Sequence, residues 1–311
     1  MKLKKVVITG GAGFIGSHLA DVLITDNQVT IIDDLSTGTL NNITDIITNK
    51  NIKFIRESVL NLELLESIFQ DVDFVFHLAA IPSVVRSIND PIATNEVNIT
   101  GTLNVLSAAR KSKVKKVVFA SSSAVYGEAS ELPTKEDTPL NFQSPYALTK
   151  LTGEYYCRLF KELYRQPTIC LRYFNVYGPR QSSASEYSAV IPLFLHNVLK
   201  KRSPVIYGDG NQTRDFVFVE DVVQANIIAA ESEATGVFNI GSGESITINN
   251  LAQKIIAITG NNLQPTHKKV RIGEIRDSLA DITLALKLGY IPKHSLDSGL
   301  RETKKSIRIR N

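Results

Sequence analysis

The fold is decided by Val6-Val7-Ile8-Thr9-Gly10-Gly11-Ala12-Gly13-Phe14-Ile15-Gly16, close to the start of a 311-residue chain. An apolar run leads directly into a glycine-rich turn and then into an apolar-periodic segment, which predicts a strand, a tight turn and a helix. Gly10 permits the turn, Gly13 lets the backbone approach a pyrophosphate, and Gly16 allows the helix to pack closely on the strand. The spacing GxxGxxG therefore indicates a dinucleotide site, although a glycine string alone is equally a loop that needs positive φ.

A second apolar segment, Val29-Thr30-Ile31-Ile32, ends in Asp33 and Asp34, at about the distance where an acid meets the adenine ribose. A carboxylate there accepts a hydrogen bond from the 2′-hydroxyl and repels a 2′-phosphate, and no Arg or Lys stands beside it. The pair therefore favours NAD over NADP. We interpret the subsequent Ser36-Thr37-Gly38 as a cap over the adenosine, the alternative being an ordinary loop.

Strand-like and helix-length segments alternate through the first half of the chain. Further strands are expected at 52–55, 73–77, 117–120 and 168–172. This alternation predicts an α/β fold with a doubly wound parallel sheet. The second half is less regular, with helical candidates at 190–200, 219–231 and 248–258 and a strand-like segment at 237–240. We expect a dinucleotide-binding domain over 1–172, to which the chain returns at about 215–240, and a smaller C-terminal α/β substrate domain over 173–311.

Tyr146-Ala-Leu-Thr-Lys150 is the stretch that points to chemistry. On a helix, a spacing of four places the phenol and the amine on one face, one turn apart. Ser122 comes after the apolar segment 117–120 and would emerge at the carboxyl edge of the sheet, where open α/β folds bind ligands. A tyrosine ionises at a pH of about 10 unless a cation favours the phenolate, and Lys150 is placed to be that cation. We expect these three groups to be catalytic, the alternative being a packed ring beside a solvated amine.

The composition, with 43% hydrophobic and 21% charged residues, is that of a soluble enzyme, and the net charge of +4 is small for this length. The basic residues are scattered apart from runs at 111–116 and 304–310, which we expect to be solvated, so nucleic-acid binding has little support. Cys157 and Cys170 lack CxxC spacing and the five histidines lack ligand spacing, so no disulfide framework and no metal site are expected. We find no targeting or transmembrane segment and expect a cytoplasmic protein without membrane association.

Several motifs together resemble the extended short-chain dehydrogenases/reductases, specifically the nucleotide-sugar 4-epimerases, over almost the whole chain. The motifs are Gly10-Gly-Ala-Gly-Phe-Ile-Gly16, Asp33-Asp-Leu-Ser-Thr-Gly38, His77-Leu-Ala-Ala80, Ala120-Ser-Ser-Ser-Ala-Val-Tyr-Gly127, Tyr146-x-x-x-Lys150, Leu171-Arg-Tyr-Phe-Asn-Val-Tyr-Gly-Pro-Arg180 and Arg214-Asp-Phe216. The resemblance implies a Rossmann-type fold, a tightly retained NAD, and a homodimer that pairs two long helices at about 95–111 and 145–164.

The same resemblance implies roles for residues that bind the cofactor. Leu78, Ala79 and Ala80 would line it, Asn98 would help to hold it, and Tyr173 would approach the nicotinamide. Ser58, before Val59, stands where relatives usually have an aspartate that reads the adenine, which leaves the adenine contacts open. The expected cofactor-binding set is Gly10, Gly13, Phe14, Ile15, Gly16, Asp33, Asp34, Ser36, Thr37, Gly38, Ser58, Val59, Leu78, Ala79, Ala80, Asn98, Tyr146, Lys150 and Tyr173.

For the substrate, the resemblance implies a UDP-sugar. Asn175 would hold the sugar region, Arg214 and Arg271 the diphosphate, and Glu274 the uridine ribose; arginine suits this because it contacts phosphate in a bidentate way. Four residues would enclose the uracil, unless they are simply core residues: Ala189, Val190, Val205 and Tyr207. The expected substrate-binding set is Ser83, Ser122, Asn175, Ala189, Val190, Val205, Tyr207, Arg214, Arg271, Glu274 and Ser278.

The reaction type is inferred from the two residues next to the catalytic hydroxyl. Related 4,6-dehydratases carry an Asp-Glu pair there and decarboxylating relatives commonly a glutamate, whereas this chain has Ser122-Ser123-Ala124. Oxidation at C4 and re-reduction, a 4-epimerisation, is the chemistry left. Ser278 is small where related enzymes gate the C2 substituent, so N-acetyl sugars are expected to be accepted beside UDP-glucose and UDP-galactose. UDP-glucuronate 4-epimerase, another epimerase or reductase of the family, and a non-catalytic NAD- and nucleotide-sugar-binding module remain the alternatives.

Overall fold

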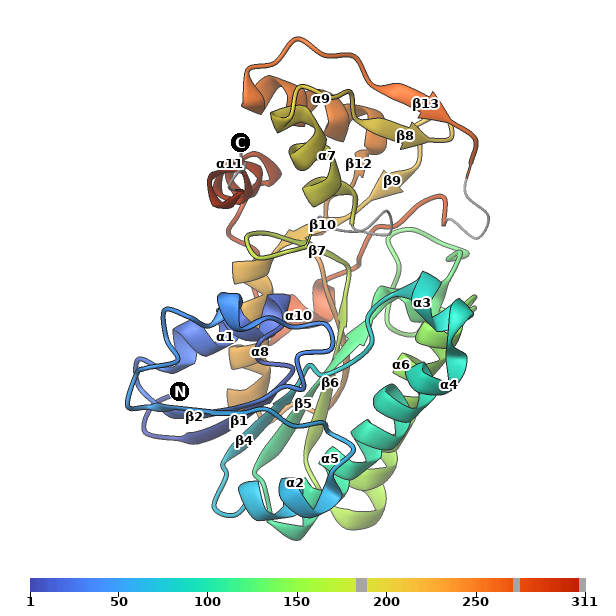
Figure 1. Ribbon diagram of the computed structural model, residues 1–311. Helices are drawn as coiled ribbons and strands as arrows, with labels where there is room; N and C mark the ends of the chain where they lie inside the picture. Colours follow the sequence, from blue (N-terminus) through green and yellow to red (C-terminus); the bar gives the residue numbers. More distant parts are fainter. Residues whose placement is uncertain (183–188, 271–274, 308–311) are drawn as a thin grey trace.

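Seven parallel strands form one sheet in the computed structural model, which describes residues 1–182, 189–270 and 275–307 (Figure 1). In spatial order the strands are β11 (Gly236–Ile240), β6 (Thr168–Tyr173), β5 (Lys116–Ser122), β4 (Phe74–His77), β1 (Lys5–Thr9), β2 (Gln28–Ile32) and β3 (Ile52–Ile55). The chain runs outward from β1 in one direction through β2 and β3, and then in the other through β4, β5, β6 and β11. The expected doubly wound, Rossmann-type sheet is therefore confirmed.

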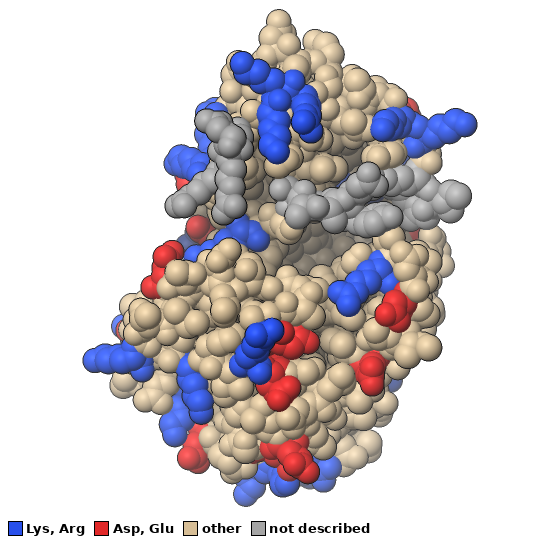
Figure 2. Space-filling model, viewed as in Figure 1, with Lys and Arg blue, Asp and Glu red and all other residues tan. Residues whose placement is uncertain are grey.

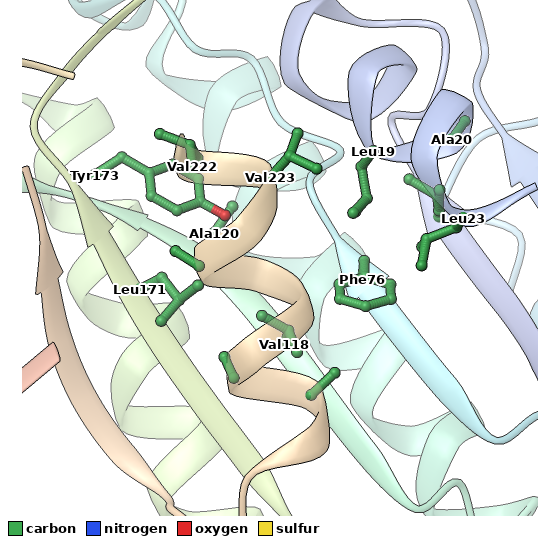
Figure 3. Packing of buried hydrophobic residues seen from close by; sticks show 14 of the residues in the cluster. Leu19, Ala20, Leu23, Phe76, Val118, Ala120, Leu171, Tyr173, Val222 and Val223 are labelled. Carbon is green, nitrogen blue, oxygen red and sulfur yellow. The ribbon is translucent and has the colours of Figure 1, made fainter. Parts of the chain in front are cut away.

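Helices cover both faces of this sheet (Figure 1). On one face lie α1 (Phe14–Leu23) and α8 (Val219–Glu231); on the other lie α2 (Leu62–Ile68), α5 (Gly101–Lys111) and α6 (Pro145–Tyr164). Alternate strand residues face the two layers: Val118 belongs to the same apolar cluster as Leu19 and Val223 (Figure 3), whereas Phe119 belongs to the other cluster with Phe160. We call the sheet with these helices the sheet lobe.

The helix expected at about 95–111 is present, begins earlier at Pro91 and contains one irregular turn. It is divided into α4 (Pro91–Asn95), a π-helical turn (Glu96–Thr100) and α5. Gly101 begins α5 against Val59, and a Cβ there would lie 2.5 Å from a methyl carbon of that valine. A π-turn inserts one extra residue into the helix, which re-aims the side chains that it carries. Here the re-aimed residue is Asn98, which is buried beneath the expected active site.

The second half of the chain builds a small lobe above the carboxyl edge of the sheet (Figure 1). Its elements are β7 (Asn175–Tyr177), α7 (Val190–Leu199), β8 (Val205–Tyr207), β9 (Thr213–Arg214), β10 (Phe216–Phe218), β12 (Ile246–Thr247), α9 (Ile248–Thr259), β13 (Thr266–Lys268) and α11 (Leu296–Ser306). They share an apolar core that includes Phe194, Leu251 and Leu300. The chain returns to the sheet lobe through α8, β11 and α10 (Thr283–Lys287); the short helices η1 (Leu40–Asn42), α3 (Val84–Asn89) and η3 (Ser123–Tyr126) connect strands of the sheet lobe.

One of the lysines expected to be solvated is buried. Lys116 is 5% exposed, and its ammonium donates to the carbonyl oxygens of Ala229, Ser232 and Ala234 at the end of α8. A cation is favourable there because the last carbonyls of a helix lack partners and carry partial negative charge. Burial lowers the pKa of Lys116. The expectation that the run 111–116 is solvated therefore does not hold for Lys116. It does hold for Lys111, which is exposed beside Glu66.

The two cysteines, Cys157 and Cys170, are buried and unbridged. Among the described residues, no three His, Cys, Asp or Glu side chains converge as a metal site would require, and no helix is both long and apolar enough to cross a membrane. Acidic and basic side chains are interspersed over the sheet lobe on the face shown in Figure 2.

Candidate active site

The glycine turn between β1 and α1 forms a tight cradle. Gly10 has φ +72°, and a Cβ on it would lie 2.6 Å from the backbone nitrogen of Ala79. A Cβ on Gly16 would collide with the carbonyl oxygen of Gly10, so the helix can approach the turn this closely only with glycine there. Helix α1 begins after Gly13 without a side-chain cap, which leaves the first amide groups of the helix to a ligand. Such a helix start binds a pyrophosphate well.

The acidic residue after β2 is fixed against this cradle. Asp33 accepts hydrogen bonds from the backbone N–H groups of Ala12 (3.0 Å) and Leu35 (2.8 Å), and burial raises its pKa. A Cβ on Gly38 would lie 2.9 Å from the Asp33 carboxylate, so the loop folds closely over it. Asp34 accepts from the N–H of Ser36 at 2.8 Å. A carboxylate has about four acceptor positions, so Asp33 keeps capacity for ribose hydroxyls.

The backbone after β4 is held by a buried chain of hydrogen bonds. The N–H of Ala79 donates to Thr9 Oγ1 (3.3 Å), which lies 2.7 Å from His77 Nδ1, and His77 Nε2 lies 2.9 Å from Thr102 Oγ1. Burial lowers the pKa of His77 to about 3, so the ring is neutral. This chain fixes the segment that contains Leu78, Ala79 and Ala80 next to the glycine cradle.

Asn98 uses its side chain on protein groups. Its Oδ1 accepts from the N–H of Ile81 (2.8 Å), and its Nδ2 donates to the carbonyl of Ile81 (3.2 Å) and to Thr149 Oγ1 (3.0 Å). Asn98 thus joins the segment after β4 to the helix α6. Its expected contact with the cofactor stays a prediction, and the structure adds this supporting role to it.

Three other expected cofactor residues lie in defined surroundings. Ser58 Oγ accepts from the N–H of Leu60 at 3.2 Å, and Val59 packs against the start of α5. Tyr173 points into the core between β6 and α8, where its hydroxyl donates to Asn226 Oδ1 at 2.9 Å (Figure 3). The polar end of Tyr173 is therefore engaged in the core, so only its ring and backbone are left for the expected nicotinamide contact.

The three expected catalytic groups come together at the carboxyl edge of the sheet. Ser122 ends β5, and its side chain lies close enough to that of Tyr146, in the first turn of α6, to influence the pKa of the phenol. Lys150 lies one turn further along α6; its Nζ is 6.0 Å from the Tyr146 ring centroid and donates to the carbonyl of Ala120 at 2.8 Å. A phenol, a hydroxyl and an ammonium around one point can move the proton of a substrate alcohol.

Burial governs the electrostatics of this group. It lowers the pKa of Lys150 to about 8, and the carboxylate of Glu154 one turn away acts in the opposite direction. Burial also raises the pKa of Tyr146, and the nearby Ser122 opposes that rise.

A cavity of about 270 Å³ is lined by residues of the small lobe. Six of the expected substrate residues line it: Asn175, Ala189, Val190, Val205, Tyr207 and Arg214. Arg214 Nη1 donates to the carbonyls of Thr213 (2.8 Å) and Arg276 (3.0 Å), which holds its guanidinium at the rim. Arg271 and Glu274 lie outside the described residues.

Three expected substrate residues, Ser83, Ser122 and Ser278, do not line this cavity, and the polar Gln212 is among the lining residues that were not expected. Ser83 caps α3 by accepting the N–H of Arg86 at 3.1 Å, and Ser278 is half-buried near the return of the chain to the sheet lobe. Gln212 lines the cavity and donates to the carbonyl of Tyr207 at 2.8 Å. Its place two residues before Arg214, in the same polar stretch, was the signal available in the sequence.

Comparison with known proteins decides the family. The family model for the NAD-dependent epimerase/dehydratase family matches residues 6–241. The chain belongs to this family. A UDP-N-acetylglucosamine 4-epimerase from Methanobrevibacter ruminantium, solved with UDP-N-acetylmuramic acid, has a TM-score of 0.96 and is 45% identical over 98% of both chains. A UDP-glucose 4-epimerase from Thermotoga maritima, solved with UDP-glucose, has a TM-score of 0.92 and 39% identity over 97% of this chain and 98% of that one.

Curated relatives agree at this level. A putative UDP-glucose 4-epimerase of Methanocaldococcus jannaschii is 42% identical over 95% of this chain and 96% of its own. The expectation of a UDP-sugar 4-epimerase, an isomerase, is confirmed as a class. The expected NAD is likewise confirmed as the cofactor of the family, and the glycine cradle with the buried Asp33 fits a dinucleotide without a 2′-phosphate.

Relatives with other substrates are also similar. A UDP-glucuronic acid 4-epimerase from Bacillus cereus, solved with UDP-glucuronic acid and NAD, has a TM-score of 0.90 and 35% identity over 97% of this chain and 98% of that one. A UDP-N-acetyl-α-D-glucosaminuronate decarboxylase from Bacillus cytotoxicus is 37% identical over 96% of each chain. Family membership alone therefore does not select the sugar.

Proposed function

We propose that the chain interconverts the C4 epimers of UDP-N-acetylglucosamine and of UDP-glucose. The observation that carries this is the convergence of Ser122, Tyr146 and Lys150 at the sheet edge, below a pocket lined by Tyr207 and Arg214. A nucleotide held by the pocket would direct its sugar toward the catalytic groups. The division into an NAD-binding unit over 1–172 and a sugar-nucleotide-binding unit over 173–311 is part of this proposal.

Each catalytic side chain has one task in this account. Tyr146, as the phenolate, takes the proton of the C4 hydroxyl, directly or through Ser122, and later returns a proton to the same oxygen. Ser122 orients that hydroxyl and supports the phenolate. Lys150 contributes its positive charge and would hold the nicotinamide ribose. Bound NAD supplies hydride acceptance and return at C4. Between these two steps the 4-keto sugar rotates, so that its other face receives the hydride.

The residues after Ser122 support epimerisation over the other reactions of the family. Decarboxylation and dehydration need a further acid or base at the sugar, and Ser123 and Ala124 supply none. Ser123 begins the short helix η3, in which the Ser122 hydroxyl accepts the N–H of Ala124 at 3.2 Å. Oxidation and re-reduction at C4 is the reaction that these residues leave.

The N-acetylated substrate is supported by two observations. Ser278 has a small side chain at the position expected to gate the C2 substituent, so it leaves room for an acetamido group. The relative with 45% identity is a UDP-N-acetylglucosamine 4-epimerase. UDP-glucuronate is the second candidate, because a UDP-glucuronic acid 4-epimerase is 35% identical.

The test is incubation of the purified protein with UDP-glucose, UDP-N-acetylglucosamine and UDP-glucuronate separately, without added reductant, and then separation of the C4 epimers. Conversion of UDP-N-acetylglucosamine and UDP-glucose to equilibrium mixtures supports the proposal. Conversion of UDP-glucuronate alone moves the assignment to the second candidate. Binding of all three without conversion contradicts an epimerase and favours a non-catalytic module.

We also propose a homodimer that pairs α6 with its copy. Helix α6 carries an exposed stripe of large apolar side chains, Leu148, Tyr155, Leu159 and Leu163, and Ile92 on the adjacent α4 is 79% exposed. Such a stripe is unusual for a surface that stays in water, and a two-fold axis would bury it against itself. Light scattering after size exclusion should give twice the chain mass, and Leu159→Glu should give the monomer. A monomeric wild type would contradict the pairing.

A further inference from the structure

The first turn of α6 makes a contact that could not be predicted from its own sequence. The backbone N–H of Tyr146 donates to Ser87 Oγ at 3.0 Å, and Ser87 lies 59 residues earlier, in α3. Ser87 is fully buried and itself donates to the carbonyl of Val84 at 2.6 Å. This places a hydroxyl from another helix directly against the peptide of the expected catalytic tyrosine.

The remaining N–H groups at the start of α6 show why this contact matters. Pro145 has none, the N–H of Ala147 donates to the capping Ser144 Oγ at 3.2 Å, and that of Leu148 donates to the Ser144 carbonyl at 3.0 Å. The structure describes every residue of this turn. Within it, the N–H of Tyr146 is the one donor that neither the helix backbone nor the capping Ser144 accepts. Ser87 accepts it, so the cap of the catalytic helix is completed by α3.

The other side of the same residue is held as well. The carbonyl of Tyr146 accepts from Thr149 Oγ1 at 2.8 Å, and Thr149 Oγ1 accepts in turn from Asn98 Nδ2 at 3.0 Å. Ser87 and the Asn98–Thr149 pair therefore clamp the backbone of Tyr146 from two different elements. The phenol that must meet Ser122 depends on that clamp for its position.

Helix α3 depends on the same bond. It has six residues, which is too few for a helix to be stable alone. All six are described, and Ser87 is the buried one among them. Its first turn comes after Ser83, which is expected at the sugar, and after the segment 78–81, which is expected at the cofactor. The Ser87 hydroxyl thus joins the turn that lines the site to the helix that carries the chemistry.

We propose that Ser87 is a positioning residue for Tyr146, and that its hydroxyl sets the placement of the phenol through the backbone of α6. This inference rests on the proposed role of Tyr146. It assigns Ser87 an effect on turnover rather than on substrate affinity, since the nucleotide pocket is built by α7, β8 and β10 in the other lobe.

The experiment compares Ser87→Ala, Ser87→Thr and Ser295→Ala as NAD-loaded enzymes, with rates expressed per bound NAD. Ser295 caps α11 by accepting the N–H of Ser298 at 3.2 Å, so its loss costs a comparable cap far from the site. We expect Ser87→Ala to lower kcat by about 10- to 100-fold with little change in KM, because misplacement of a reacting group by about 1 Å has effects of that size. Ser87→Thr should keep most of kcat, and Ser295→Ala all of it.

Three results would overturn the inference: a wild-type kcat in Ser87→Ala, an equal loss in Ser87→Ala and Ser87→Thr, which would indicate packing, or an equal loss in Ser295→Ala, which would indicate general destabilisation. Tyr146→Phe measured in parallel separates this failure from failure of the proposed function. If Tyr146→Phe is inactive and Ser87→Ala is normal, only the role of Ser87 is wrong. If Tyr146→Phe stays active, the proposed mechanism is wrong as well.

Discussion

The two lobes hold their functional groups in different ways. In the sheet lobe, Lys150 is buried and Tyr146 is half-buried, and both are fixed by hydrogen bonds that come from several elements of the fold. In the small lobe, the cavity has mostly apolar walls on short elements, and Arg214 is held at its rim by two backbone carbonyls. The difference suggests a division of labour, in which changes in the sheet lobe affect turnover or folding and changes in the small lobe affect substrate affinity.

The proposed division of labour between the lobes is tested most severely by a substitution of Tyr146. Tyr146→Phe removes only the hydroxyl, so we expect the fold and the bound NAD to survive while epimerisation falls by about 10²- to 10⁴-fold, the usual contribution of a general acid–base group. Tyr164→Phe, at the exposed end of the same helix and outside the apolar stripe, is the control and should be normal. The rate of C4 epimer formation per bound NAD is the measurement. Substantial activity in Tyr146→Phe would remove the sheet lobe's catalytic role.

The next largest effect concerns the buried ion pair of Glu154, one turn along α6 from Lys150. Glu154 accepts from Arg172 Nε (2.8 Å) and Nη2 (2.7 Å), and both side chains are 4% exposed. Glu154→Gln leaves a buried guanidinium without its anion, which should lower the free energy of unfolding by about 3–5 kcal/mol. Glu162→Gln breaks the exposed pair with Arg158 on the same helix and should cost less than about 1 kcal/mol. Urea unfolding of both variants makes the comparison, and equal midpoints would contradict it.

In the small lobe, Arg214→Ala should act on affinity. A hydrogen bond to a charged group contributes about 1.5–3 kcal/mol, so we expect KM for the UDP-sugar to rise roughly 10- to 100-fold with a much smaller change in kcat. Arg276→Ala is the matched control, because its side chain is 65% exposed next to the same site. Initial rates over a range of substrate concentrations separate KM from kcat. A fall in kcat with KM unchanged would break the proposed division of labour.

The smallest effect is a pH dependence set by Lys150. Its pKa is lowered to about 8, so the ammonium is present below that pH and is lost above it. We expect kcat to fall as the pH rises through about 8. Lys150→Arg should be slower at every pH but should lack this descending limb, because a guanidinium keeps its proton. The same limb in both enzymes would assign it to another group.

The sheet lobe was also the part that the sequence predicted better. Its central strands are almost wholly apolar and therefore easy to recognise. The strand expected at 117–120 is β5, which extends further only by the polar residues Lys116, Ser121 and Ser122 at its ends. The residues that line the cavity of the small lobe were named through a motif rather than a pattern, since strands as short as β9 and β12 have no readable period.

The features that the sequence did not reveal mostly depend on neighbours that are distant in the sequence. The π-turn before α5 inserts one residue that hydrophobic spacing cannot register. Lys116 is buried because the end of α8, more than a hundred residues later, supplies carbonyls. Ser87 lies in a largely exposed six-residue helix and gains its role only from α6.

The central claim, that the catalytic groups of the sheet lobe oxidise and re-reduce C4 of a sugar held by the small lobe, is tested most directly with an isotope. UDP-N-acetylglucosamine deuterated at C4 would be converted by the NAD-loaded protein, and both epimers would be analysed by mass and by NMR. The account predicts that the deuterium stays at C4 of both epimers and that no reduced cofactor accumulates in solution. Exchange of the deuterium with solvent during epimerisation would contradict it.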